Sequence, residues 1–266
     1  MDNRPIGILD SGLGGLTSVR ELHKQLPEER VIYYGDTART PYGSKSPETI
    51  IKFATQIVDY LVSCNTKMII IACNTVSAWA LKSLREKYPA IPILGVIGPT
   101  VRKVVSEGVD RVGVIATKAT VGSDTYGESL RELNPDIEVY SKACPALVPL
   151  IEDGFAGTEI MELTIKHYMD DFIKENSIED LILGCTHYPL VASQIRKLYP
   201  NVRLYNSSAE VVTDAKDILT EKEMLAAGSA FTDRYYASDL SDNFIVMTDA
   251  LFEGTDFNVH FLKLEE

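Results

Sequence analysis

The sequence predicts an α/β protein with two pseudo-symmetric parallel-sheet αβα domains and an active site in the cleft between them. Two observations carry this prediction. Short β-branched runs alternate with helix-length segments, and continuous apolar strands of this kind need helices on both faces of a parallel sheet. The alternation then repeats with a similar spacing, which indicates an internal duplication.

Four strands are expected in each half. The first half has apolar runs at residues 5–9, 31–34, 68–71 and 91–96, and the second has runs at 111–115, 136–140, 180–183 and 201–205. Corresponding runs lie about 110 residues apart. The third run of each half therefore occupies an equivalent place in its sheet.

The duplication sets the expected domain boundaries. We expect residues 1–97 plus 208–266 to form the first α/β lobe and residues 98–207 the second. The boundary near Gly98-Pro99 is predicted to be a tight hinge or crossover, since no low-complexity linker is present. Two candidate N-cap serines, Ser207 and Ser208, precede a helical pattern, and the apolar run at 258–264 is expected to return to the first half.

Composition narrows the class of protein. The 266 residues are 45% hydrophobic and carry a net charge of -12, with no cluster of Lys and Arg. A nucleic-acid partner is therefore not expected, and small-molecule chemistry is favoured. The sequence shows neither a signal peptide nor a membrane span, so we expect a cytoplasmic protein with no membrane partner. Its four cysteines form no C-x-x-C pair or metal-ligand cluster, so no metal is expected.

Two cysteines follow equivalent strands. Cys73 follows the third strand of the first half and Cys185 follows the third strand of the second. Ligands bind beyond the carboxyl ends of strands in open α/β sheets, so both thiols are expected at the site. A single cysteine there would more simply be a buried apolar side chain, but the equivalent pair favours function. Cys64 precedes its strand and is expected at a helix terminus or turn on the opposite side.

Two thiols that face one ligand can perform acid–base chemistry. One could remove a proton from a carbon while the other delivers a proton to the opposite face, which inverts the stereocentre. A positioned acid or base contributes typically ~10²–10⁴-fold to the rate. Because a free thiol has a pKa near 8.5, one cysteine must be held as thiolate and the other as thiol, which requires polar neighbours.

A glycine-rich turn follows the first strand. Asp10 and Ser11 end that strand, and the glycines after them lead into a helix whose N-terminus would suit a substrate carboxylate. An ordinary turn with Asp10 or Ser11 as N-cap is the alternative. A dinucleotide fingerprint with Asp36 as ribose acceptor is a weaker one, because Thr17 stands where that motif needs glycine.

Further polar residues lie at suitable strand ends. Tyr42 and Gly43 belong to a turn after the second strand, with backbone donors and a phenol, although an ordinary surface turn is equally consistent. Thr117 and Thr120 correspond to Asp10 and Ser11 in the duplicated frame, and each could also cap a helix. His187 lies two residues from Cys185 and could be its proton partner or a substrate contact, whereas a lone histidine is more often structural.

Taken together, these motifs resemble the bacterial glutamate racemases of the aspartate/glutamate racemase family. The matching segments are Asp10-Ser11-Gly12-x-Gly14-Gly15, Pro41-Tyr42-Gly43, Cys73-Asn74-Thr75, Val148-Pro149-Leu150-Ile151-Glu152 and Gly184-Cys185-Thr186-His187-Tyr188-Pro189. The resemblance implies that Cys73 and Cys185 are the catalytic acid/bases, assisted by Asp10, Glu152 and His187. The substrate-binding residues that it implies are Asp10, Ser11, Tyr42, Gly43, Asn74, Thr75, Thr117, Thr186 and His187.

The resemblance also implies an activity. It points to a cofactor-independent isomerase that interconverts L- and D-glutamate, supplies D-glutamate for peptidoglycan and forms a homodimer. Related aspartate and hydantoin racemases share the two-cysteine plan, so an aspartate racemase remains an alternative. A two-lobed amino-acid-binding regulator is a further one, in which the thiols would only line the cleft. Glu152 is included on the family match alone, since by itself it reads equally as a solvated carboxylate at a helix end.

Overall fold

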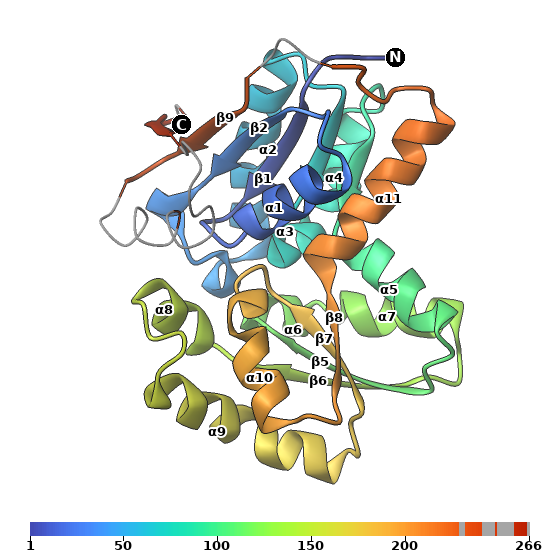
Figure 1. The fold of residues 1–266 in the computed structure, drawn as a ribbon, viewed down its shortest axis with the longest axis vertical. Helices are drawn as coiled ribbons and strands as arrows, with labels where there is room; N and C mark the ends of the chain where they lie inside the picture. Colours follow the sequence, from blue (N-terminus) through green and yellow to red (C-terminus); the bar gives the residue numbers. More distant parts are fainter. Residues whose placement is uncertain (229–231, 241–247, 249–257, 265–266) are drawn as a thin grey trace.

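Two parallel sheets form the two lobes of the molecule (Figure 1). The computed structural model describes residues 1–228, 232–240, 248 and 258–264. Within these residues the first sheet has the strand order β10-β9-β2-β1-β3-β4 and the second has the order β6-β5-β7-β8. The strands are β1 (Ile6–Asp10), β2 (Val31–Gly35), β3 (Met68–Ile71), β4 (Ile93–Gly95), β5 (Arg111–Ala116), β6 (Glu138–Ala143), β7 (Asp180–Gly184), β8 (Arg203–Asn206), β9 (Arg234–Ala237) and β10 (Val259–Phe261).

Helices connect successive strands and cover the sheets. The first lobe carries α1 (Leu16–Gln25), η1 (Thr37–Arg39), η2 (Tyr42–Ser44), α2 (Pro47–Ser63), α3 (Asn74–Trp79) and α4 (Leu81–Lys87). The second carries α6 (Lys118–Gly122), α7 (Thr125–Leu133), α8 (Leu147–Glu152), α9 (Glu159–Glu175), η3 (Tyr188–Val191) and α10 (Ala192–Leu198). Helix α5 (Ile97–Ser106) lies where the two lobes meet, and α11 (Ser207–Glu221) follows β8 and runs along the first lobe beside α1.

The predicted fold class and duplication are confirmed. Strands β2-β1-β3-β4 and β6-β5-β7-β8 have the same relative order, and every neighbouring pair in both sheets is parallel. All eight expected strands are present. Strand β10 falls in the apolar run that was expected to return to the first half, and it pairs with β9, which the sequence did not predict. The boundaries of the two lobes stay a prediction.

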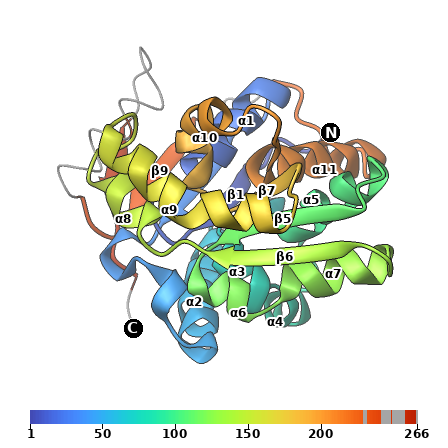
Figure 2. The same ribbon diagram turned by 90° about the horizontal axis from the view of Figure 1, so that it is seen from below.

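Alternate residues of each central strand face opposite helical layers. In β1, Ile8 belongs to a buried cluster that includes side chains of α1, α5 and α11, whereas Leu9 belongs to another that includes side chains of α2, α3 and α4. In β7, Ile182 belongs to the cluster that includes side chains of α5 and α7, whereas Leu183 belongs to the cluster that includes side chains of α8, α9 and α10. Figure 2 shows the second sheet between these two helical layers. The period of two in a pleated strand therefore gives each lobe its three-layer arrangement.

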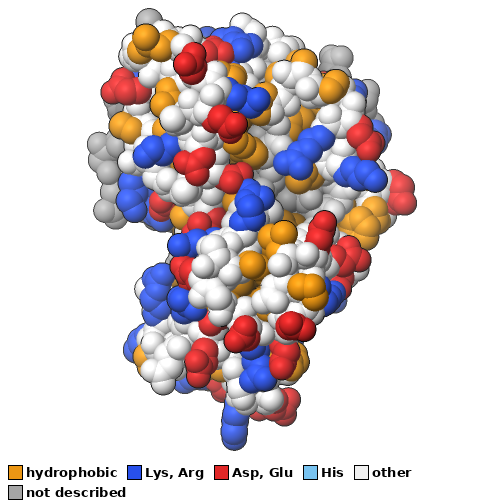
Figure 3. All heavy atoms as spheres, turned by 90° about the vertical axis from the view of Figure 1, so that its right-hand side faces the viewer, with side chains coloured by type: hydrophobic (Ala, Val, Ile, Leu, Met, Phe, Trp, Pro, Cys, Tyr) orange, Lys and Arg blue, Asp and Glu red, His pale blue; other side chains and the backbone are white. Residues whose placement is uncertain are grey.

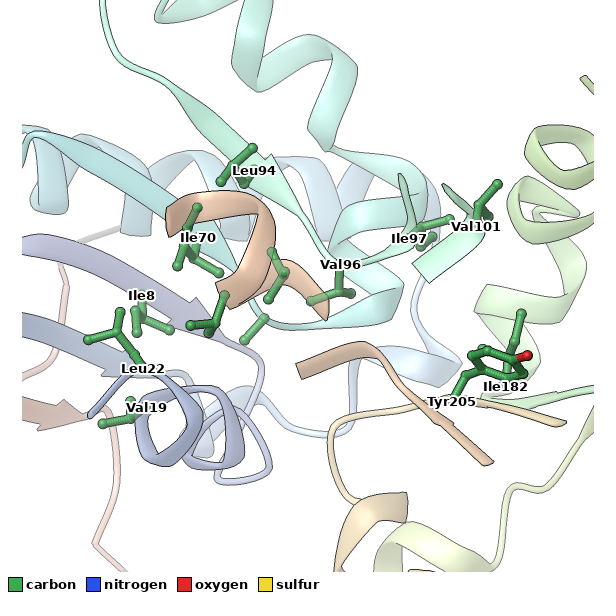
Figure 4. Packing of buried hydrophobic residues seen from close by; sticks show 14 of the residues in the cluster. Ile8, Val19, Leu22, Ile70, Leu94, Val96, Ile97, Val101, Ile182 and Tyr205 are labelled. Carbon is green, nitrogen blue, oxygen red and sulfur yellow. The ribbon is translucent and has the colours of Figure 1, made fainter. Parts of the chain in front are cut away.

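One hydrophobic cluster continues from lobe to lobe (Figure 4). It runs from Ile8 and Ile70 in the first sheet, through Val101 of α5, to Ile182 and Tyr205 in the second. Helix α11 also contributes buried side chains to this cluster. The two lobes therefore share one continuous hydrophobic cluster.

Two details differ from the sequence-based expectations. Gly98 and Pro99, expected at a tight hinge or crossover, lie in the first turn of α5, where the missing N–H of proline interrupts no helical hydrogen bond. The N-cap of α11 is Asn206, whose side chain accepts from Ser208 N at 3.1 Å, so the two serines are not the caps. Cys64 lies at the C-cap of α2, as expected.

The surface carries charges of both signs. On the face shown in Figure 3, acidic and basic side chains are interspersed over both lobes. Among the described residues, no helix is both long and apolar enough to cross a membrane.

Candidate active site

A cavity lies between the carboxyl ends of the central strands of the two sheets. Ten of the residues expected at the site line it: Ser11, Tyr42, Gly43, Cys73, Asn74, Thr75, Thr117, Cys185, Thr186 and His187. Both thiols that the strand-end argument expects at the site therefore line one cavity.

Cys73 lies at the start of α3, directly after β3. It is 5% exposed, and its Sγ donates to Ser11 Oγ at 3.2 Å. Burial raises the pKa of Cys73, and the neighbouring charge of Asp10 adds to the effect, so that the pKa reaches about 12. At neutral pH this side chain is therefore the protonated thiol.

Cys185 has a different neighbour. Its Sγ lies 3.8 Å from His187 Nδ1, and His187 Nε2 lies 3.0 Å from Glu152 Oε1. Burial lowers the pKa of His187, but hydrogen bonds to Cys185 and Glu152 outweigh burial and raise the pKa to about 10. The ring is therefore an imidazolium at neutral pH, and its positive charge lies beside Cys185 Sγ.

Asp10 lies behind the cavity wall. Its Oδ2 accepts from Gly12 N at 3.1 Å and from Gly15 N at 3.0 Å, and its Oδ1 accepts from Thr186 Oγ1 at 3.4 Å. Burial raises the pKa of this carboxyl. The anion that the glycine turn binds is therefore the side chain of Asp10 itself. Because α1 has Gly15 as its N-cap and no side-chain cap bond, the N-cap alternative for Asp10 and Ser11 is wrong.

The glycine turn closes tightly against the second lobe. A Cβ on Gly14 would lie 2.4 Å from Thr186 Oγ1 and 2.6 Å from His187 Nδ1. No side chain fits between these groups, so this position requires glycine. The turn therefore brings the first lobe into direct contact with the Cys185 motif.

The phenol hydroxyl of Tyr42 is hydrogen-bonded to another side chain and is not free to bind a ligand. Its hydroxyl donates to Asp36 Oδ2, which also accepts from Arg39 Nε at 2.7 Å, while Ser238 Oγ donates to Asp36 Oδ1 at 2.8 Å. The carboxylate of Asp36 is fully buried and occupied by these donors, which leaves the dinucleotide alternative without its ribose acceptor. At this turn, the cavity wall is formed by Gly43 and by atoms of Tyr42 other than its hydroxyl.

Hydroxyl groups join the lobes beside the cavity. Thr117 caps α6 by accepting from Thr120 N at 3.2 Å, and its hydroxyl also lies 3.0 Å from Thr75 Oγ1 of the first lobe. Thr117 is therefore both the N-cap of α6 and a residue of the cavity lining, as the two alternatives proposed. Thr120 lies 3.2 Å from Thr75 Oγ1 but is not part of the cavity lining.

Some lining residues were not predicted individually. Pro41, Val148 and Gly184, which belong to three of the recognised motifs, line the cavity, as does Thr40, which belongs to none. Thr40 follows η1, and nothing in the local sequence indicates the path of that loop toward Gly12. Glu152 lies outside the lining but contacts it through His187. Among the described residues, no cluster of His, Cys, Asp or Glu could hold a metal ion.

Comparison with known proteins agrees with this geometry. The model of the Asp/Glu/Hydantoin racemase family matches residues 10–215. The glutamate racemase of Sulfurihydrogenibium sp. (strain YO3AOP1) is 44% identical over 245 residues, covering 91% of this chain and 94% of that protein. The glutamate racemase of Geobacter metallireducens is 40% identical over 267 residues, covering 98% of this chain and 97% of that protein.

A solved structure extends the likeness to three dimensions. Glutamate racemase from Francisella tularensis in complex with D-glutamate has a TM-score of 0.93 and 40% identity, covering 100% of this chain and 99% of that chain. Fold, site and relatives together define an amino-acid racemase, an isomerase. The chain belongs to the Asp/Glu/Hydantoin racemase family.

Proposed function

We propose that this racemase interconverts L- and D-glutamate by two-base proton transfer at Cα, with Cys73 and Cys185 as the two acid/bases. The observation that carries the mechanism is the placement of both thiols at one cavity, each supplied by a different lobe. Glutamate as substrate rests on the relatives, which are glutamate racemases at 40% identity or more over nearly the full chain.

The two thiols have different surroundings, which assign them different roles. Cys185 lies beside the imidazolium of His187 and is assigned the role of base, whereas the buried Cys73 keeps its proton and acts as the acid. One direction of racemisation then proceeds by removal of the Cα proton by Cys185 and delivery of a proton by Cys73 to the opposite face. The reverse direction requires the opposite protonation of the pair.

The remaining polar residues fall into two groups. Asp10 assists Cys73 by its charge, and Glu152 assists Cys185 by holding His187 in place. The cavity-lining polar residues bind the two carboxylates and the amino group of the substrate: Ser11, Tyr42, Gly43, Asn74, Thr75, Thr117, Thr186 and His187. For Tyr42 the structure favours a backbone contact, because its phenol hydroxyl is bound to Asp36.

Turnover in D₂O tests the proposal. Purified protein is incubated with L-glutamate or with L-aspartate, without pyridoxal phosphate, and optical rotation is followed together with deuterium at Cα. We expect rotation to decay with glutamate, and early label to appear mainly in the product of inverted configuration. Decay with aspartate alone would favour the aspartate racemase alternative. No decay with either would favour a binding protein, and equal early label in substrate and product would contradict two separate bases.

The cellular role follows the resemblance. On that ground we propose that the protein supplies D-glutamate for peptidoglycan, lies in the cytoplasm and forms a homodimer. Depletion of the protein in its host should create a requirement for external D-glutamate, cell fractionation tests the location, and sedimentation equilibrium tests the assembly.

A further inference from the structure

A buried polar contact joins the lobes behind the cavity. Tyr126 of α7 is 2% exposed, and its hydroxyl donates to Asn74 Oδ1 at 2.7 Å. Asn74, also 2% exposed, is the first residue of α3, follows Cys73 and lines the cavity. A tyrosine of the second lobe thus holds a cavity side chain of the first.

The contact determines which end of the amide is free. Burial raises the pKa of Tyr126, so the hydroxyl keeps its proton and is the donor. The carbonyl end of Asn74 is therefore occupied. Its Nδ2 makes one long bond, to Ser207 Oγ at 3.4 Å, and the second N–H has no partner within the described residues. The amide therefore keeps a donor available, which suits a carboxylate.

We propose that Tyr126 is a positioning residue, whose hydroxyl orients the Asn74 amide so that Nδ2 serves as a donor to a substrate carboxylate. The inference rests on the proposed function. Because Tyr126 and Asn74 come from different lobes, this orientation is completed only when the lobes are together. Without the hydroxyl, the amide can rotate by half a turn and present its oxygen to the carboxylate, and two acceptors repel each other.

Tyr126→Phe tests this with nearly unchanged volume. Loss of one hydrogen bond to a charged group corresponds to a KM for glutamate raised roughly 10- to 100-fold, with kcat changed by less than about threefold. The control is Tyr205→Phe, a buried tyrosine in the same hydrophobic cluster whose hydroxyl binds Glu107 and Asp180 far from the cavity. The control should leave KM within about twofold of wild type.

A double-mutant cycle separates positioning from a general structural role. In an Asn74→Ala background, Tyr126→Phe should change KM by less than about twofold, because its effect passes through Asn74. An undiminished effect in that background would overturn the inference, as would loss of kcat with KM unchanged. If Asn74→Ala fails to fold by circular dichroism, Asn74→Ser takes its place.

Ligand-induced stabilisation gives a second readout. D-glutamate should raise the melting temperature of the wild type and of Tyr205→Phe, but much less that of Tyr126→Phe at equal concentration. Equal increases in melting temperature in the wild type and both variants would contradict a positioning role for Tyr126. Failure of the proposed function would look different, since the wild-type protein itself would then neither racemise nor be stabilised by glutamate.

Discussion

The carboxylate of Glu152 lies 3.0 Å from Nε2 of His187, while Nδ1 of the same ring lies 3.8 Å from Cys185 Sγ. Both neighbours of the ring favour its protonated form. The charge state of the Cys185 side of the cavity therefore depends on a carboxylate that does not line the cavity.

Removal of that carboxylate should change the pH profile. Glu152→Gln keeps a hydrogen-bonding side chain but removes the negative charge, so the pKa of His187 should fall below its value of about 10. The alkaline limb of kcat/KM should then move to lower pH by about one unit or more. The matched control is Glu159→Gln, an exposed carboxylate at the start of α9. An unchanged alkaline limb in Glu152→Gln would count against this coupling.

Stability should decrease at alkaline pH. The pKa of His187 is raised from 6.5 to about 10 and that of Cys73 from 9.0 to about 12, so the folded state binds both protons more tightly than the unfolded state. The stability that this binding contributes is fully present below pH 6.5 for His187 and below 9.0 for Cys73. It is lost as pH rises through about 10 and then about 12. Urea unfolding from pH 6 to 10.5 should show a decrease that is smaller in His187→Gln.

Substitution of Cys73 or Cys185 should affect activity differently from substitution of Cys64. Cys73→Ser and Cys185→Ser should each reduce racemisation by at least ~100-fold, because a hydroxyl is a much weaker acid than a thiol. Cys64→Ser, at the C-cap of α2, is the control and should stay within about twofold of wild type. Circular dichroism checks that all three variants fold. Loss of activity in Cys64→Ser alone would refute the strand-end argument.

Gly14 should not tolerate a methyl group. In Gly14→Ala the new Cβ would lie 2.4 Å from Thr186 Oγ1, so the lobes must separate locally and the Cys185 motif must shift. We expect a destabilisation of about 1–3 kcal/mol and a loss of kcat of more than ~10-fold. Gly122→Ala is the matched control, because nothing lies within 4 Å of a Cβ there. Chemical unfolding and steady-state kinetics measure both, and wild-type kcat in Gly14→Ala would show that the contact is not needed.

Lys67 should matter for stability rather than for catalysis. Its fully buried ammonium lies 2.6 Å from Glu29 Oε2 and donates to the carbonyl oxygens of Asp2 and Met224 at 2.6 and 2.7 Å. Lys67→Met leaves a buried carboxylate unpaired and should cost about 3–5 kcal/mol in urea unfolding. Glu29→Gln in the same chain should recover part of this loss. Lys52→Met, on an exposed position of α2, should change stability by less than about 0.5 kcal/mol.

Much of the fold was predictable because its central strands are buried on both faces. The residues at 68–71 and 181–183 are continuously apolar, and such runs are recognisable without structural information. Strand β9 was missed because it has only four residues and begins with the charged Arg234, and its strand character comes from pairing with β2 on one side and β10 on the other.

Some features of the site could likewise be predicted from the sequence, and others could not. Cys73 and Cys185 follow strands, so their place depends on topology alone, and the sequence indicated it. The direction of the Tyr42 phenol depends on Asp36, Arg39 and Ser238, which meet only in the folded chain. The contacts of Asn74 with Tyr126 and of Gly14 with Thr186 join opposite lobes, and no local pattern encodes the angle at which two lobes meet.

The return of the chain through α11 determines when the first lobe can be completed during translation. Helix α11 packs beside α1 and α5 and contributes Val211, Val212, Ala215 and Leu219 to the core shared with the first sheet. These residues leave the ribosome only after the whole second lobe has been synthesised. Until then, the nascent chain lacks the helix that covers part of that apolar face, and chaperones that bind exposed hydrophobic segments have their longest opportunity to act there.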